Sequence, residues 1–245
     1  MTTVVIPVKA LSQAKTRLSP ILDGEERAAL CLSMLEDILG AIKGAATPLE
    51  LRVLTSDPRV AELCSRQRVM VWREPKSVGL NESLRKAVET CRRQGISRAL
   101  FMPGDIPLVQ SEDIDQLCSL QEVQVAVTPA WDGKGTNALL LKPPDVIPFR
   151  FGPESFDAHV REAKTRGLKV QVAPFQRISW DIDHPEDLLT FLRLAQSGRK
   201  GGLRKKTEDL LERWNLASKL ETFVQRKRSL PGSLSSSLAE PSPLT

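Results

Sequence analysis

Short apolar runs alternate with helical stretches along the chain, and this alternation limits the possible folds more than any other feature. Strands are expected at 4–8, 51–55, 69–72, 98–102, 123–127, 138–141 and 168–173. Helices are expected at 25–42, 58–66, 81–94, 111–120, 154–166 and 185–194. Because strand and helix alternate and the connections are short enough for crossovers, the pattern predicts an α/β, three-layer domain with a mainly parallel central sheet.

Local signals define the first residues of three of these helices. Asp57 is expected as an N-cap, with Pro58 at the first helical position, where its fixed φ and missing N–H suit a helix. Asn81 and Ser111 are also types that cap helices, because their side-chain oxygens accept hydrogen bonds from free backbone N–H groups. We therefore expect both of them at N-caps.

The charge is unevenly distributed. The chain has 35 Lys and Arg against 30 Asp and Glu, a net charge of +5. Residues 1–196 hold 25 of each sign, so the excess lies in residues 197–228, with ten basic and four acidic residues. We expect a main domain over 1–196, a basic helical extension over 197–228 and a disordered, Ser/Pro-rich tail over 229–245. One amphipathic helix over 206–228 would present Leu210, Leu211, Trp214, Leu220 and Phe223.

Several classes of protein are excluded by composition. No apolar run reaches the roughly 18 residues that a membrane-spanning helix needs, and the N-terminus lacks the basic and apolar regions of a signal peptide. The four cysteines form no CxxC pair and fit no zinc spacing. We interpret them as reduced core residues and expect a cytoplasmic protein with no membrane partner; they are Cys31, Cys64, Cys91 and Cys118.

Three cations follow the first expected strand. Lys9, Lys15 and Arg17 lie within nine residues of one another, and ligands of parallel sheets bind at the carboxyl ends of strands. Arg offers a bidentate fork and Lys a compact charge, so the loop suits a polyphosphate. The chain has no Walker A loop. A solvated basic surface loop is the equally open interpretation.

Three aspartates stand in two other segments. Asp105 follows a buried strand in a loop stiffened by Pro and Gly, and an extended stretch would point Asp181 and Asp183 to the same side. Carboxylates held together repel unless a cation or proton lies between them, so the three suit Mg²⁺. Asp105 in an ordinary turn, and Asp183 or His184 capping the next helix, are the alternatives.

A third candidate region spans 132–138 and 151–156. Glycines permit close approach of the backbone to a ligand, and Ser155 stands at the start of an expected helix, where free N–H groups attract anions. Thr136 adds a second hydroxyl. A glycine turn followed by a plain loop-to-helix junction explains the same residues.

Taken in order, these segments resemble the 2-phospholactate / phosphoenolpyruvate guanylyltransferases of coenzyme F420 biosynthesis over about residues 1–195. The resemblance is carried by Pro7-x-Lys9-x5-Lys15-x-Arg17-Leu18, Gly79-Leu80-Asn81, Gly104-Asp105-Ile106-Pro107, Gly135-Thr136-Asn137, Phe151-Gly152-x2-Ser155-Phe156-x2-His159 and Asp181-x-Asp183. It implies a nucleotidyltransferase-type fold for the main domain, GTP as donor, Mg²⁺ as cofactor and a three-carbon phospho-acid as acceptor.

The resemblance also implies roles for individual residues. It implies that Lys9, Lys15 and Arg17 bind the phosphates and act in catalysis, and that Leu80 and Asn81 contact the guanine. It also implies that Asp105, Asp181 and Asp183 bind the metal, and that Thr136, Gly152 and Ser155 bind the phospho-acid. The family pattern ends near residue 200, so no role is implied for the extension.

Other functions stay open at this point. The acceptor is 2-phospho-L-lactate, phosphoenolpyruvate or 3-phospho-D-glycerate, or, in a different nucleotidyltransferase, a molybdopterin or sugar phosphate. The basic extension suggests a nucleic-acid-binding protein, but the balanced main domain and the scarcity of aromatics among its cations speak against a nucleic-acid partner. An extension helix over 197–228 that binds a partner or forms a homodimer is the third possibility.

Overall fold

The computed structural model describes residues 1–74, 79–197 and 205–228. A seven-stranded sheet lies at its centre, in the order β3-β2-β1-β4-β6-β5-β7. The strands are β1 (Thr2–Val8), β2 (Leu49–Thr55), β3 (Met70–Arg73), β4 (Ala99–Phe101), β5 (Val125–Pro129), β6 (Thr136–Leu141) and β7 (Val170–Val172). β6 pairs antiparallel with both β4 and β5, and the other neighbours are parallel. The predicted α/β class and mainly parallel sheet are confirmed.

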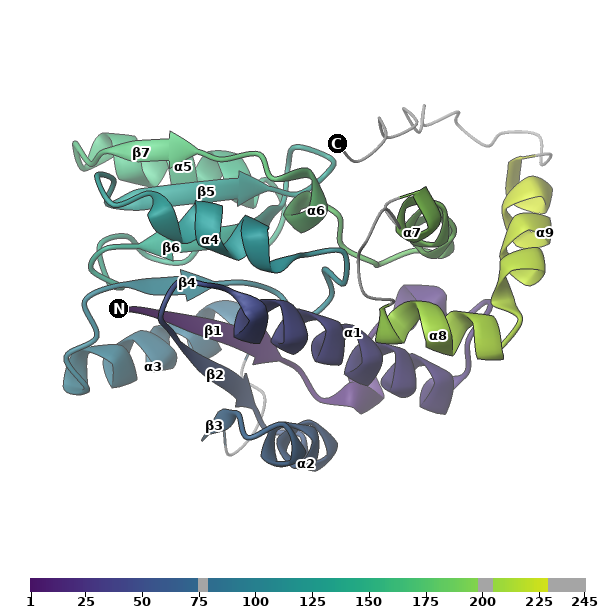
Figure 1. Ribbon diagram of the computed structural model, residues 1–245. Helices are drawn as coiled ribbons and strands as arrows, with labels where there is room; N and C mark the ends of the chain where they lie inside the picture. Colours follow the sequence, from purple (N-terminus) through teal and green to yellow (C-terminus); the bar gives the residue numbers. More distant parts are fainter. Residues whose placement is uncertain (75–78, 198–204, 229–245) are drawn as a thin grey trace.

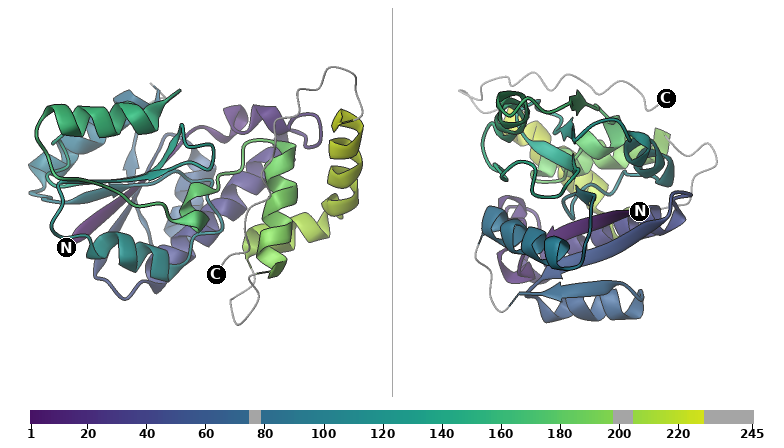
Figure 2. Two further views of the ribbon diagram at one scale, coloured as in Figure 1. Left: turned by 90° about the horizontal axis from the view of Figure 1, so that it is seen from above. Right: turned by 90° about the vertical axis from the view of Figure 1, so that its left-hand side faces the viewer.

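Helices cover both faces of the sheet (Figure 1, Figure 2). They are α1 (Gly24–Gly44), α2 (Pro58–Arg66), α3 (Leu80–Arg93), α4 (Ser111–Ser119), α5 (Ser155–Thr165), α6 (Gln176–Ser179), α7 (Pro185–Ser197), α8 (Lys206–Arg213) and α9 (Leu216–Arg228). Alternation along each strand divides the core. Val4 and Ile6 of β1 pack with α1, α2 and α4, whereas Val5 packs with α3 and α5.

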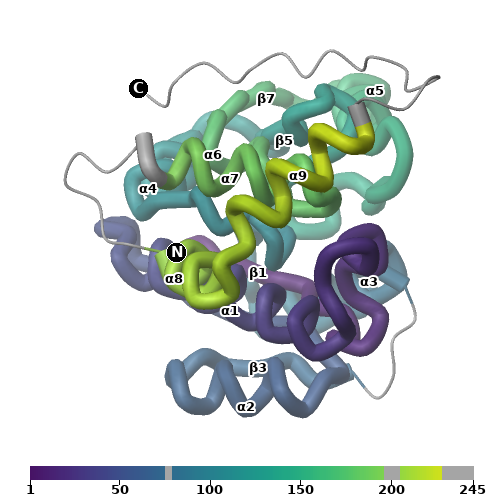
Figure 3. The backbone as a smooth tube through the Cα atoms, turned by 90° about the vertical axis from the view of Figure 1, so that its right-hand side faces the viewer, coloured from purple at the N-terminus to yellow at the C-terminus, as the bar shows by residue number. Residues whose placement is uncertain are grey.

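One edge of the sheet gathers the loops that carry the predicted site. β1 and β4 end there, at Val8 and Phe101, and the short 3₁₀ turns Leu11–Gln13 and Thr16–Leu18 follow β1. Because β6 runs antiparallel to β4, its first residue, Thr136, lies at this same edge. The helices α7, α8 and α9 stand beyond this end of the sheet (Figure 1), and Figure 3 views the molecule from their side.

Asp57 is confirmed as a helix cap, and two other expected caps are wrong. The Asp57 carboxylate accepts hydrogen bonds from the N–H groups of Arg59 and Val60. The N-caps of α3 and α4 are instead Gly79 and Gln110. The two side chains expected as caps form hydrogen bonds with distant parts of the chain instead. The Asn81 amide pairs with the backbone of Phe151, and the Ser111 hydroxyl donates to the Ala41 carbonyl.

The basic extension forms two helices and not the single expected helix over 206–228. The chain turns between them at Asn215, whose φ of 47° ends α8 in the left-handed region. Both helices pack on the main domain. Asp37 of α1 accepts hydrogen bonds from the N–H groups of Lys206 (2.7 Å) and Thr207 (2.9 Å), and buried side chains of α8 and α9 join the core beside α1, namely Leu210, Leu211, Leu216, Leu220 and Val224.

Three remaining expectations concern the membrane, the cysteines and the tail. Among the described residues, every helix is too short or too polar to cross a bilayer. Cys31, Cys64, Cys91 and Cys118 are free and buried, as expected. The expected disorder of 229–245 lies outside the described residues, as do residues 198–204 of the expected extension.

Candidate active site

Lys15 lies between two of the predicted aspartates. Its Nζ is 2.5 Å from Asp105 Oδ2 and 2.8 Å from Asp183 Oδ1, and its side chain is 8% exposed. Burial alone would lower the pKa of Lys15, but the two carboxylates outweigh burial and raise it. Lys15 also has a φ of 51°, a conformation that costs a non-glycine residue about 1 kcal/mol or more. The turn after β1 therefore holds a charged lysine against the aspartates.

The loop after β4 positions Asp105. Gly104 passes so close to β1 that a Cβ there would lie 3.3 Å from Val8 Cγ2. The Asp105 carbonyl accepts a hydrogen bond from Ile182 N–H (3.0 Å), which ties this loop to the segment that carries the other two aspartates. Asp105 Oδ1 is buried and lacks a hydrogen-bond partner among the described residues. An orphaned carboxylate oxygen of this kind fits a cation ligand.

Asp181 is held by Asn137, the second residue of β6. The Asn137 amide donates to Asp181 Oδ1 (3.0 Å) and to the carbonyls of Ile178 and Ser179. Burial and the charge of Asp105 raise the pKa of Asp181 to about 6. Without a cation beside it, the Asp181 carboxylate therefore binds a proton at a higher pH than an ordinary aspartate does.

Asp183 has the opposite electrostatic environment. Burial alone would raise its pKa, but Lys15 and Arg17 more than offset burial and lower it. Arg17 Nη1 is 3.2 Å from Asp183 Oδ2. The described residues contain no group of three or more His, Cys, Asp or Glu arranged to hold a metal ion. The three-aspartate Mg²⁺ site therefore stays a prediction, and Lys15 supplies the cation between Asp105 and Asp183.

A cavity of about 450 Å³ opens beside Lys15. The predicted residues that line it are Lys9, Lys15, Arg17, Leu80, Asp105 and Asp183. Lys9 and Arg17 are exposed at the surface of this cavity. Cys31 and Met34 of α1, which the sequence did not assign to the site, also line it. Burial raises the pKa of Cys31 to about 11, so its thiol is neutral and forms part of an apolar wall.

The predicted acceptor residues form a second group. Thr136 Oγ1 lies 3.1 Å from His159 Nδ1 and accepts a hydrogen bond from Ser155 Oγ at 3.3 Å. Ser155 is the first residue of α5. Gly152, at φ 134°, makes the bend that leads into this helix, a conformation that favours glycine. The structure thus brings together hydroxyl groups that are far apart along the chain.

Asn81 lies apart from the cavity. Its Nδ2 donates to the Phe151 carbonyl and its Oδ1 accepts from Phe151 N–H, both at 2.9 Å. The side chain is thus engaged with the backbone that precedes Gly152. Its neighbour Leu80 lines the cavity. The predicted guanine contact of Asn81 has no support from this geometry and stays untested.

Two further residues of the site were not assigned a role from sequence. Asn137 and His159 stand within the quoted motifs, but no local pattern shows what either side chain contacts. The hydrogen-bond partners of Asn137 lie 41 to 44 residues away along the chain. Thr136, the partner of His159 Nδ1, lies 23 residues away. One signal could have indicated these roles: both are polar residues that stand inside a motif, Asn137 next to an expected strand and His159 within an expected helix.

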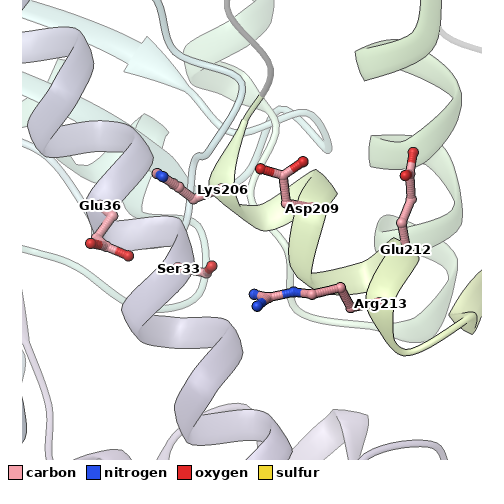
Figure 4. Close-up of a pocket in the computed structure, with 6 residues that line it drawn as sticks. All are labelled: Ser33, Glu36, Lys206, Asp209, Glu212 and Arg213. Carbon is pink, nitrogen blue, oxygen red and sulfur yellow. The ribbon is translucent and has the colours of Figure 1, made fainter.

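A hollow of about 640 Å³ between α1 and α8 holds none of the predicted residues. It is lined by Ser33, Glu36, Lys206, Asp209, Glu212 and Arg213. Figure 4 shows charged side chains of both signs around it, with Glu36 and Ser33 on α1 and the others on α8. It shares no lining residue with the cavity beside Lys15.

Comparisons with known proteins find guanylyltransferases of similar sequence. A phosphoenolpyruvate guanylyltransferase of Sphaerobacter thermophilus is 38% identical over 190 residues, 77% of this chain and 91% of that protein. A 2-phospho-L-lactate guanylyltransferase of Methanocaldococcus jannaschii is 34% identical over 185 residues, 76% of this chain and 80% of that one.

A solved structure shares the fold. A protein described as a nucleotide-diphospho-sugar transferase, from Desulfovibrio desulfuricans G20, superposes with a TM-score of 0.74 at 22% identity and covers 91% of this chain and 97% of its own. The family described as "Guanylyl transferase CofC like" matches residues 2–227. The expectation that the family pattern ends near residue 200 is therefore wrong, since α8 and most of α9 lie within the match. On these grounds the chain belongs to the CofC-like guanylyl transferase family.

Proposed function

We propose that this protein transfers GMP from GTP to the phosphate of a three-carbon phospho-acid and releases pyrophosphate. Phosphoenolpyruvate and 2-phospho-L-lactate are the acceptors in the names of its relatives, and 3-phospho-D-glycerate is the third candidate. The observation that carries the proposal is Lys15, buried between Asp105 and Asp183 beside a cavity that Lys9 and Arg17 also line. The product would serve coenzyme F420 biosynthesis.

The chemistry needs positioning more than proton transfer. A phosphomonoester has a second pKa of about 6, so the attacking oxygen is already largely ionised at neutral pH. Two anions must instead be brought together, and charge develops on the departing pyrophosphate. Lys9, Lys15 and Arg17 would bind these phosphates and stabilise that charge.

Mg²⁺ is the proposed cofactor. The chemistry of the donors fits it, because Asp105 presents an orphaned buried oxygen and because burial and the neighbouring carboxylates raise the pKa of Asp181. In this structure Lys15 occupies the place between Asp105 and Asp183. Asp105, Asp181 and Asp183 would hold the ion, which when bound screens the phosphates and assists departure of pyrophosphate. Once those carboxylates have another cation, Lys15 becomes available to the triphosphate.

The acceptor is assigned to Thr136, Gly152 and Ser155. The support is the pair of hydroxyls that stand together at the start of α5; the N–H groups of Ser155 and Phe156 there already donate to the carbonyls of Gly152 and Lys134. A molybdopterin or sugar phosphate acceptor remains the alternative substrate. The nucleic-acid alternative has less support, because Lys205 and Lys219 of the extension donate to the carbonyls of Val109 and Ile21 on the main domain.

The test is pyrophosphate release from GTP and Mg²⁺ with each phospho-acid in turn. We expect turnover with at least one of them, and its loss in Asp105→Asn while the fold survives. Asp145→Asn, an exposed carboxylate paired with Arg92 at the other end of α3, is the matched control and should keep full activity. No turnover with any acid would refute the proposed substrate class, and an active Asp105→Asn would remove Asp105 from the metal site.

A further inference from the structure

We propose that Asn81 and His159 are positioning residues that hold the acceptor loop, residues 149–152, in its binding conformation. The inference rests on the proposed assignment of the phospho-acid to Thr136, Gly152 and Ser155. It gives Asn81 a different role from the guanine contact that the family resemblance implies. It also gives a role to His159, to which the resemblance assigned none.

Asn81 holds the loop from α3. Its amide forms a two-way pair with the Phe151 backbone, donating to the carbonyl and accepting from the N–H, each at 2.9 Å. The pair has the geometry of two backbone groups in a sheet, so it uses one donor and one acceptor of the side chain together. α3 begins at Leu80, which lines the cavity beside Lys15. Two consecutive residues of one helix turn therefore contact the cavity and the acceptor loop.

His159 holds the loop from α5. Arg150 N–H donates to its Nε2 at 2.9 Å, so Nε2 carries no proton and the neutral ring bears its hydrogen on Nδ1. Nδ1 is 3.1 Å from Thr136 Oγ1 and donates to it. The ring is fully buried, and burial lowers its pKa to about 4, so it stays neutral at neutral pH.

This hydrogen-bond direction has a consequence for Thr136. Its Oγ1 accepts from His159 and from Ser155 Oγ, which uses both acceptor positions of the hydroxyl. Its own hydrogen is then directed to a third partner, and an anionic acceptor is the partner that such a donor favours. One histidine thus orients Thr136 and also fixes the backbone just before Gly152.

Aromatic packing supports the same loop. The Phe151 ring meets the His159 ring edge-on, with centroids 4.9 Å apart, and stacks with Phe149 at 6.0 Å. Phe149 in turn packs on Phe101 of β4 at 4.8 Å. The loop is therefore attached to the core by its side chains, while Asn81 and His159 set the direction of its backbone before the bend at Gly152.

Asn81→Ala separates the two roles of Asn81. The side chain is exposed, so the variant should fold. If Asn81 positions the loop, the KM for the phospho-acid rises about tenfold, as expected for the loss of two hydrogen bonds. The affinity for α,β-methylene-GTP, measured by calorimetry without the acid, stays the same. Weaker binding of this analogue with an unchanged acceptor KM would overturn the proposal in favour of a guanine contact.

His159→Gln tests the second residue. We expect the same signature, a higher acceptor KM with unchanged binding of the GTP analogue. Because both side chains hold one loop, the double variant should raise the acceptor KM by less than the product of the single effects. Arg98→Gln is the matched control. It also removes buried hydrogen bonds, at the opposite edge of the sheet, and should leave both affinities unchanged even if it lowers the melting temperature.

Thr136→Val distinguishes failure of this inference from failure of the proposed acceptor site. If Thr136→Val raises the acceptor KM and the Asn81 and His159 variants do not, the positioning role is wrong and the acceptor site stands. If Thr136→Val also leaves the acceptor KM unchanged, the acceptor lies elsewhere and both proposals fall. If His159→Gln does not fold, Asn81→Ala decides the matter alone.

Discussion

At the scale of single residues, the site depends on charged side chains in positions where any one of them, without its partners, would be destabilising. Lys15 has a left-handed backbone and a buried ammonium group, and Asp105 and Asp183 are near neighbours of like charge. The buried ammonium group is stabilised by the two carboxylates, and the carboxylates are stabilised by the ammonium group between them. A ligand that brings its own cation and anions can therefore exchange partners with them at little cost.

His159 leads to a prediction about pH. Its pKa is lowered to about 4 in the folded protein, against about 6.5 in an unfolded chain. Between these values the unfolded chain binds the additional proton, so the free energy of unfolding falls as the pH drops from about 6.5 toward 4. His159→Gln should weaken this dependence in urea titrations, whereas exposed His184→Gln should retain it. The same slope in His159→Gln and in the parent would contradict this.

At the scale of elements, the start of α8 is capped from another helix. Asp37 of α1 accepts from two N–H groups in the first turn of α8, in place of the local cap that a helix commonly carries. The relation between α1 and α8 is thus set by a buried carboxylate as well as by apolar packing.

Asp37→Ala should lower the free energy of unfolding by about 1 to 3 kcal/mol, because it leaves two N–H groups without an acceptor. Hydrogen exchange should rise in α8 more than in the strands. Asp115→Ala is the matched control: Asp115 is half-buried and accepts from the N–H groups of Ala46 and Thr47, just after the end of α1. Uniformly faster exchange in both variants would show that Asp37 does not act on α8 in particular.

At the scale of the whole molecule, the basic extension is part of the folded body. Leu211, Leu216 and Leu220 are nearly fully buried, and the contacts of α8 with α1 and of α9 with α7 extend the core beyond the end of the sheet (Figure 1). Of the cations that the structure describes in this segment, those exposed on the two helices are Lys206, Arg213, Lys219, Arg226 and Lys227. The leucines of the same helices face the core.

A chain that ends at residue 205 should therefore lose stability. Three buried leucines contribute about 1.5 to 3 kcal/mol each, and a loss of roughly 5 kcal/mol lowers the melting temperature of a protein of this size by about 10 to 20 °C. Thermal unfolding followed by circular dichroism gives the measurement. A chain that ends at residue 228 keeps α8 and α9 and is the control. Equal melting temperatures for the two chains would show that the extension is dispensable.

The sequence alone determined features that depend on near neighbours or on the position of a loop relative to a strand. The start of helix 58–66 was predicted because Asp57 and Pro58 act on adjacent backbone. The loops with Lys15 and Asp105 were assigned to one sheet edge because parallel strands end there. The tertiary structure decided everything that depends on partners far along the chain: the capping of α3 and α4, the antiparallel direction of β6, and the contacts of Asn81 and His159. Their side chains have several possible partners of similar energy, and packing selects among them.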